Sequence, residues 1–115
     1  AQEETVEKVK VSKVMHQYTP EQVAKMQTEQ MNELLNLSNE QFSTVYELNL
    51  KVASKIDVIK KSDMTPERKK EFIEGNGKDR MNALSTVLTQ EQHAQYVTYM
   101  DNQKKLHEAT LETAE

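Results

Sequence analysis

The stretch STVLTQEQHAQY, residues 85–96, contains a short polar phrase that the chain uses more than once. In this phrase an apolar residue precedes threonine or serine, and glutamate and glutamine follow two and three positions later. The phrase returns as NLSNEQF at 36–42, as YTPEQV at 18–23 and, less faithfully, as MTPERK at 64–69. Because serine and threonine are preferred immediately before a helix, the repetition predicts four helix starts.

The chemistry of a helix start accounts for each position of the phrase. The hydroxyl accepts a hydrogen bond from a backbone N–H of the first turn that has no partner within the helix. The glutamine three residues later can accept from the N–H of the cap residue itself, which completes a capping box. The glutamate places negative charge at the positive end of the helix dipole. The predicted caps are Thr19, Ser38, Thr65 and Thr89, and the predicted helices run near residues 19–35, 38–62, 65–87 and 89–110.

The composition also favours helices over strands. Glutamate, lysine, glutamine, methionine and leucine, which are good helix formers, dominate a chain with two glycines, two prolines and six aromatic residues. We therefore predict an all-α fold of four helices. Gly75 and Gly77 fall inside the third helix, where each glycine costs about 1 kcal/mol, and they predict a kink or a break there. Apolar residues recur at helical spacing on the second helix, at Phe42, Val45, Leu48, Val52, Ile56 and Ile59.

The lengths of the helices predict how they are arranged. The second and third helices are each about 35 Å long and are joined by a short turn at 62–63, so they form a long central hairpin flanked by the other two. Its open end would bring Leu37–Gln41 beside Leu88–Gln92. Residues 1–17 are highly charged and predict a mobile leader, whereas residues 18–115 form a single helical domain.

Two of the copies carry a resemblance to a known family. An apolar-Leu-Ser/Thr-x-x-Gln phrase on each side of a helical hairpin resembles the LTxxQ-motif family of Spy/CpxP-like periplasmic helical proteins, over about residues 23–105. The resemblance implies an antiparallel dimer with a concave face, which in the chaperone members holds unfolded proteins without ATP. This chain departs from the family in one motif serine, in a shorter hairpin and in its acidic net charge. The motif residues are Leu37, Ser38, Gln41, Leu88, Thr89 and Gln92.

Other features bear on the compartment and the partners. The chain begins AQEET without a methionine, as a secreted protein does after a signal peptidase has cut, and with the resemblance this predicts a periplasmic location. No apolar run approaches the length of a membrane span, so we expect no membrane insertion. The net charge of −4 disfavours nucleic acid, because binding to phosphates requires a dense basic surface.

The sequence gives no support for catalysis. It contains no cysteine nucleophile, no glycine-rich phosphate loop and no HExxH-like pair of histidines, so we expect neither an enzyme nor a cofactor. His16 lies in the leader, and His93 and His107 would lie about 21 Å apart along one helix. A metal ion needs ligands about 2 Å from it, so no metal site is expected within one chain, although pairing between two subunits remains an alternative.

The middle of the chain offers a candidate partner-binding surface. Residues 51–80 carry nine basic residues against six acidic ones, and Lys69, Lys70, Phe72 and Ile73 combine charge with apolar surface. The alternative is that the lysines form an ordinary solvated helix surface and that the apolar pair is buried packing.

Two functions are compatible with these observations. The first is an ATP-independent chaperone (a holdase) that binds unfolded or stress-damaged envelope proteins. The second is a regulatory or sensor module that docks on one folded partner in envelope-stress signalling. In one form of this hypothesis, the module responds to a metal ion. Since so few apolar residues cannot enclose a thick core, we also expect a homodimer.

Overall fold

The computed structural model describes residues 18–114, with side chains described for residues 18–106. Within this range it contains four helices and no strand, which confirms the predicted all-α fold. The predicted leader at 1–17 lies outside the described residues. The helices are α2 (Pro20–Leu35), α3 (Asn39–Lys61), α4 (Pro66–Val87) and α5 (Gln90–Ala114).

The helices begin where the repeated phrase predicts. Each of α2, α3 and α4 starts one residue after its cap, and the cap hydroxyl accepts from the backbone N–H three residues later. Helix α5 follows Thr89 in the same way, and the Thr89 hydroxyl accepts from the Gln92 N–H at 3.1 Å. Because each signal is local to one turn, packing elsewhere does not move these boundaries.

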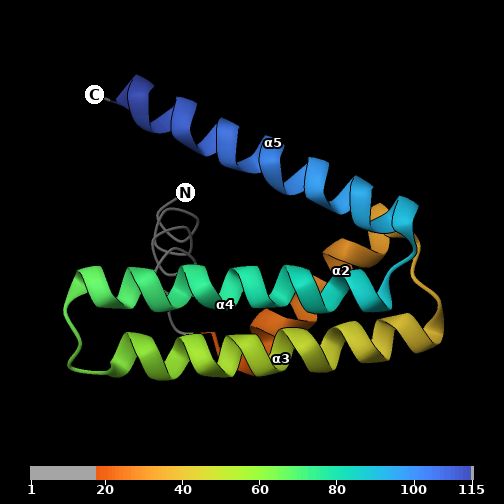
Figure 1. Cartoon of the computed structure of the whole chain (residues 1–115), viewed down its shortest axis with the longest axis horizontal. Coiled ribbons are helices and arrows are strands. Elements are labelled where there is room, and N and C mark those ends of the chain that lie inside the picture. The colour runs from red at the N-terminus through yellow and green to blue at the C-terminus, as the bar shows by residue number, and fades with distance from the viewer. Residues whose placement is uncertain (1–17, 115) are drawn as a thin grey trace, which may run out of the picture.

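Helices α3 and α4 form the predicted antiparallel hairpin, and α2 packs mainly against α3 (Figure 1). Helix α5 contacts α2 and α4 near its own start and then diverges from the hairpin (Figure 1). The residues at 100–106 of α5 are accordingly all exposed. The four helices therefore meet at the open end of the hairpin. The closed end of the hairpin is not covered by α5 (Figure 1).

The apolar core lies at that open end. Of the predicted stripe on α3, Val45 and Ile59 are buried, whereas the other four members are only half-buried. Asn49, which the sequence analysis placed outside the stripe, is fully buried instead. The central cluster consists of Met31, Leu35, Val45, Leu84, Leu88 and Tyr96.

Helix α4 runs without a break through its two glycines. The sequence predicted a kink or a break at Gly75–Gly77, and the break is wrong, since residues 66–87 are helical throughout and no described glycine has a positive φ. Packing of α4 along α3 outweighs the low helix propensity of two glycines.

Replacing the two glycines should therefore stabilise the protein. A Cβ added at Gly75 or Gly77 meets no atom within 4 Å, so alanine fits without strain. We expect Gly75→Ala and Gly77→Ala each to raise the free energy of unfolding by about 0.5–1 kcal/mol, because alanine loses less conformational entropy on folding. Urea titration followed by circular dichroism measures the change. A loss of stability in either variant would show that this turn is not helical in solution.

Candidate functional site

Both motif copies that open α3 and α5 form complete capping boxes. The Gln41 N–H donates to the Ser38 hydroxyl at 3.1 Å, and the Ser38 N–H donates to the Gln41 amide oxygen at 3.0 Å. The Gln92 N–H donates to the Thr89 hydroxyl at 3.1 Å, and the Thr89 N–H returns a bond to the Gln92 amide oxygen at 3.0 Å. These bonds fix the orientation of both glutamine side chains.

The two capping glutamines also bind each other. The Gln41 amide nitrogen donates to the Gln92 amide oxygen at 2.7 Å, and the Gln92 amide nitrogen donates to the Gln41 amide oxygen at 3.2 Å. These residues are 51 positions apart in the sequence. The two motif copies are therefore in contact, as the hairpin geometry predicts.

Each glutamine has a second donor, and each donates it to the end of another helix. Gln41 donates to the Val87 carbonyl, at the end of α4, and Gln92 donates to the Leu35 carbonyl, at the end of α2, both at 3.2 Å. Carbonyls in the last turn of a helix lack partners within that helix, so these bonds satisfy them. We call Gln41, Gln92 and these bonds the glutamine clasp. It ties all four helices together and uses the full bonding capacity of both amides.

The first copy of the phrase is a capping box without a clasp. Gln22 accepts from the Thr19 N–H at 2.9 Å, and the Gln22 N–H donates to the Thr19 hydroxyl. Across the part of the chain that the structure describes, the hydrogen bonds of the exposed Gln22 side chain stay within this box. The same motif thus has two different roles in one chain.

The connection between α2 and α3 positions the Ser38 copy. Asn36 has φ 55° and ends α2 in the left-handed conformation, which asparagine tolerates better than most residues. The Leu37 N–H donates to the Asn32 side-chain oxygen at 3.0 Å. Leu37 is half-buried and packs against the core cluster, and Leu88 is a buried member of that cluster. Both motif leucines therefore anchor the clasp in apolar surroundings.

A buried polar cluster that was not predicted from the sequence lies between the clasp and the closed end of the hairpin. The fully buried Asn49 amide donates to the Thr28 hydroxyl at 3.0 Å and accepts from Arg80 Nε at 2.7 Å. Arg80 also donates to the Met31 sulfur at 3.3 Å. We call Thr28, Met31, Asn49 and Arg80 the polar core. A spacing of four residues from Val45 to Asn49 is the signal that could have revealed it.

Arg80 is a buried cation that pairs with no carboxylate of residues 18–106. Its side chain is 8% exposed, and the guanidinium lies over the Tyr96 ring at 5.4 Å, which partly compensates its charge. Among residues 18–106 the ion pairs are Lys25 with Glu29 and Lys61 with Asp57, both on the surface. The Arg80 charge therefore depends on neutral acceptors, and Asn49 holds the shortest of those bonds.

The four predicted partner-binding residues do not share one role. Lys69 donates to the Lys60 carbonyl at 3.0 Å, near the end of α3, so its ammonium helps to close the hairpin. Ile73 is half-buried, whereas Lys70 is exposed. Phe72 is 44% exposed, and the Arg68 guanidinium lies 5.7 Å from the centre of its ring. Phe72 is thus the member of the set with accessible apolar surface.

Phe72 lines an open apolar groove between α3 and α4 near the closed end of the hairpin. We call it the tip groove, with a volume of about 430 Å³. Val58 is 68% exposed and supplies apolar surface from α3, and the buried Ile59 lies beside it. The sequence analysis missed Val58 because it falls outside the stripe at helical spacing. The groove is lined by Ser54, Lys55, Val58, Ile59, Phe72 and Asn76.

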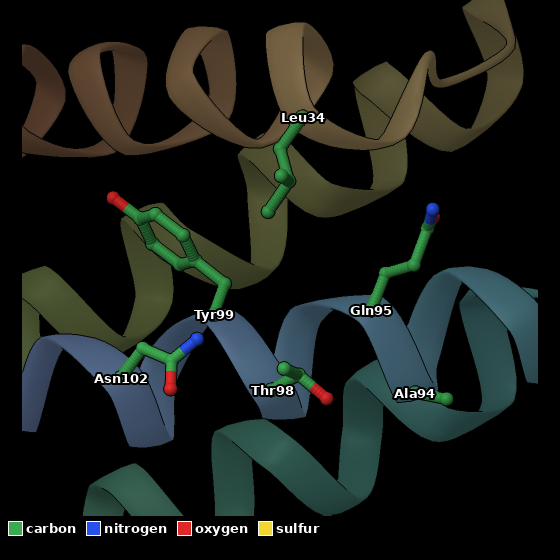
Figure 2. Close-up of a pocket in the computed structure, with 6 residues that line it drawn as sticks. All are labelled: Leu34, Ala94, Gln95, Thr98, Tyr99 and Asn102. Atoms are coloured by element: carbon green, nitrogen blue, oxygen red, sulfur yellow. The ribbon is translucent and has the colours of Figure 1, made fainter.

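A second open groove lies between α2 and α5, with a volume of about 460 Å³. Figure 2 shows Leu34 of α2 and Tyr99 of α5 extending into it from opposite sides. The Tyr99 hydroxyl accepts a hydrogen bond from the Gln30 amide at 2.8 Å, which joins the two helices. We call this the α2–α5 groove, and it is lined by Leu34, Ala94, Gln95, Thr98, Tyr99 and Asn102.

Neither a metal site nor a membrane span emerges from the described residues. Among these residues, no three histidine, cysteine, aspartate or glutamate side chains come together in a way that could hold a metal ion. His93 Nε2 lies 3.4 Å from the Met81 carbonyl, whereas His16 and the side chain of His107 lie outside the described residues. In the same part of the chain, no helix is long and apolar enough to cross a membrane.

Over residues 18–114, the fold and its grooves define a clasped bundle of four helices that presents open apolar surfaces. The chain belongs to the family described as "Domain of unknown function (DUF4890)", whose model matches residues 1–96. No curated protein and no solved structure matches the chain. The family description assigns no activity, and the resemblance to the LTxxQ-motif family remains a separate prediction.

Proposed function

We propose that this protein is an ATP-independent holdase for unfolded or stress-damaged proteins of the periplasm. The observation that carries the proposal is the exposed apolar surface of the tip groove, where Val58 and Phe72 lie beside cationic side chains. Unfolded chains expose apolar side chains, and exposed apolar patches are common sites of protein binding. A shallow groove retains such side chains weakly and without demanding one sequence.

The rest of the structure supports a binding role. The glutamine clasp and the capping boxes hold the helices at the open end, which supports the α2–α5 groove, and the bond from Lys69 to the Lys60 carbonyl joins α4 to α3 near the tip groove. The α2–α5 groove offers a second apolar surface that includes Leu34 and Tyr99. Among the described residues that line the two grooves, no nucleophilic side chain is hydrogen-bonded to a base. We therefore propose binding without catalysis and without a cofactor.

We also propose a homodimer, antiparallel as the resemblance implies. The described core is small, and the residues at 100–106 of α5 are exposed, including Met100 and Leu106. A second copy that covers this part of α5 would bury apolar surface on both chains with two-fold symmetry. We expect light scattering at micromolar concentration to give the mass of two chains. The mass of one chain across that range, with full helicity, would exclude the dimer.

The alternative function is a regulatory module that docks on one folded partner. The observation that favours it is the fixed geometry of the clasped end, since a preformed rigid surface suits one partner well. A regulatory module of this kind does not need to bind unrelated unfolded proteins in either groove.

Aggregation assays distinguish the two functions. Two unrelated substrates, for example denatured malate dehydrogenase and reduced α-lactalbumin, are followed by light scattering with and without a severalfold excess of this protein and without ATP. The holdase function predicts that scattering from both substrates falls. Unchanged scattering from both would exclude it and would favour the regulatory module.

A further inference from the structure

The closed end of the hairpin differs in charge from the rest of the chain. Residues 51–80 carry nine basic residues against six acidic ones, whereas the whole chain has a net charge of −4. The tip groove lies on this stretch, and its lining residues come from α3 and α4. A positive surface on an acidic protein attracts acidic partners specifically to that surface.

The tip groove combines apolar walls with cations at its edge. Val58 and Phe72 provide accessible apolar surface, and none of the described residues that line the groove is a carboxylate. The exposed Lys55 belongs to the lining, and the Arg68 guanidinium lies over the Phe72 ring. An apolar side chain that enters the groove therefore places its neighbouring residues close to positive charge.

Within residues 18–106, these two cations are not ion-pair partners of any carboxylate. Lys61 is paired with Asp57 at 3.0 Å, and the Lys69 ammonium is bound to a backbone carbonyl. Neither Lys55 nor Arg68 forms an ion pair with any residue in the range 18–106. Their charge therefore remains available to a carboxylate from outside the chain.

The α2–α5 groove does not have cations among its described lining residues. The described residues of its lining are leucine, alanine, glutamine, threonine, tyrosine and asparagine, and none of these is charged. Any charge preference of the protein for its clients should consequently belong to the tip groove alone.

We propose that the tip groove selects apolar protein segments flanked by carboxylates. An apolar side chain of the client packs between Val58 and Phe72, and a neighbouring aspartate or glutamate meets Lys55 or Arg68. This inference rests on the proposed function and names the chemistry of the preferred clients. The attraction is electrostatic, so the preference weakens as added salt screens it.

Two fluorescent peptides test the proposal by anisotropy at low salt. They share a Leu-Phe-Leu centre and differ only in flanks of glutamate or of lysine. We expect the wild type to bind the acidic peptide about tenfold more tightly than the basic one, because two or more exposed charge pairs each contribute modestly. Lys55→Glu should bring this ratio down to about one.

Lys25→Glu is the matched control. Lys25 lies on α2, 72% exposed in a loose pair with Glu29, and its substitution changes the net charge by the same amount as Lys55→Glu. It should leave the tenfold preference intact. Equal affinity of the wild type for both peptides, or equal effects of the two substitutions, would overturn the proposal. Binding to phosphatidylglycerol vesicles with no binding to either peptide would overturn it as well.

The aggregation assay separates this inference from the proposed function. Suppression of aggregation without a charge preference among peptides would exclude only the selection of acidic flanks. A charge preference without suppression would uphold the selection and exclude the holdase.

Discussion

Gln41→Glu should lower the free energy of unfolding by about 2 kcal/mol. Glutamate keeps the size of glutamine and keeps the acceptor for the Ser38 N–H, but it cannot donate. The Val87 carbonyl and the Gln92 amide oxygen each lose a donor, and each lost bond costs about 1 kcal/mol. Urea denaturation at neutral pH, followed by circular dichroism, measures the loss.

Gln22→Glu is the matched control for this substitution. Glutamate is as suitable as glutamine in a capping box, and its charge favours the start of a helix. Because Gln22 bonds only within its box in the described structure, the control should be neutral or slightly stabilising. If Gln41→Glu behaves like Gln22→Glu, the motif is only a helix cap and the clasp does not hold the bundle.

Asn49→Leu should have a larger effect, a loss of about 3 kcal/mol. Leucine fills a similar space but removes the acceptor of Arg80 Nε and the donor to the Thr28 hydroxyl. A cation that is 8% exposed then remains without its shortest hydrogen bond, and uncompensated buried charge is strongly destabilising. Thermal and urea unfolding both measure the loss.

A double substitution tests whether the buried charge is the cause. Asn49→Leu combined with Arg80→Met removes the cation together with its acceptor, so the double variant should be more stable than Asn49→Leu alone. If the double variant is instead less stable by the sum of the two single losses, the two residues act independently. The polar core would then be ordinary packing.

The sequence predicted those features that depend on a single helical turn. Thr19, Ser38, Thr65 and Thr89 mark the helix starts because a cap bond spans three residues and needs no tertiary contact. The meeting of Gln41 with Gln92 also followed from sequence, since two helices of 23 and 22 residues joined by a short turn must bring their outer ends together.

The sequence did not predict features that depend on how the helices pack. Asn49 and Arg80 look like solvent-facing polar residues until α2 and α5 cover them, and only the packed bundle shows that they bind each other. Gly75 and Gly77 predicted a kink or a break, but α4 continues through both glycines along α3. Lys69 looked like a binding residue, but the hairpin turn directs its ammonium to the Lys60 carbonyl.

The tip groove also depended on packing. Phe72 was a candidate for the binding surface, with buried packing as the alternative. Its partner Val58 belongs to the neighbouring helix and falls outside the stripe at helical spacing. Their apposition comes from the register of α3 against α4, which the lengths of the helices alone do not fix.

The most direct test of the claim that the tip groove holds unfolded chains compares two proteins. Suppression of aggregation is measured for the wild type and for a Val58→Ser, Phe72→Ser double variant. If clients bind in the tip groove, the wild type suppresses aggregation of unrelated denatured substrates and the double variant loses most of this activity. Met26→Ser is the control, because Met26 is 48% exposed on α2 and lines neither groove, and melting curves verify that all three proteins are folded. Full suppression by the folded double variant would contradict the claim that the tip groove holds unfolded chains.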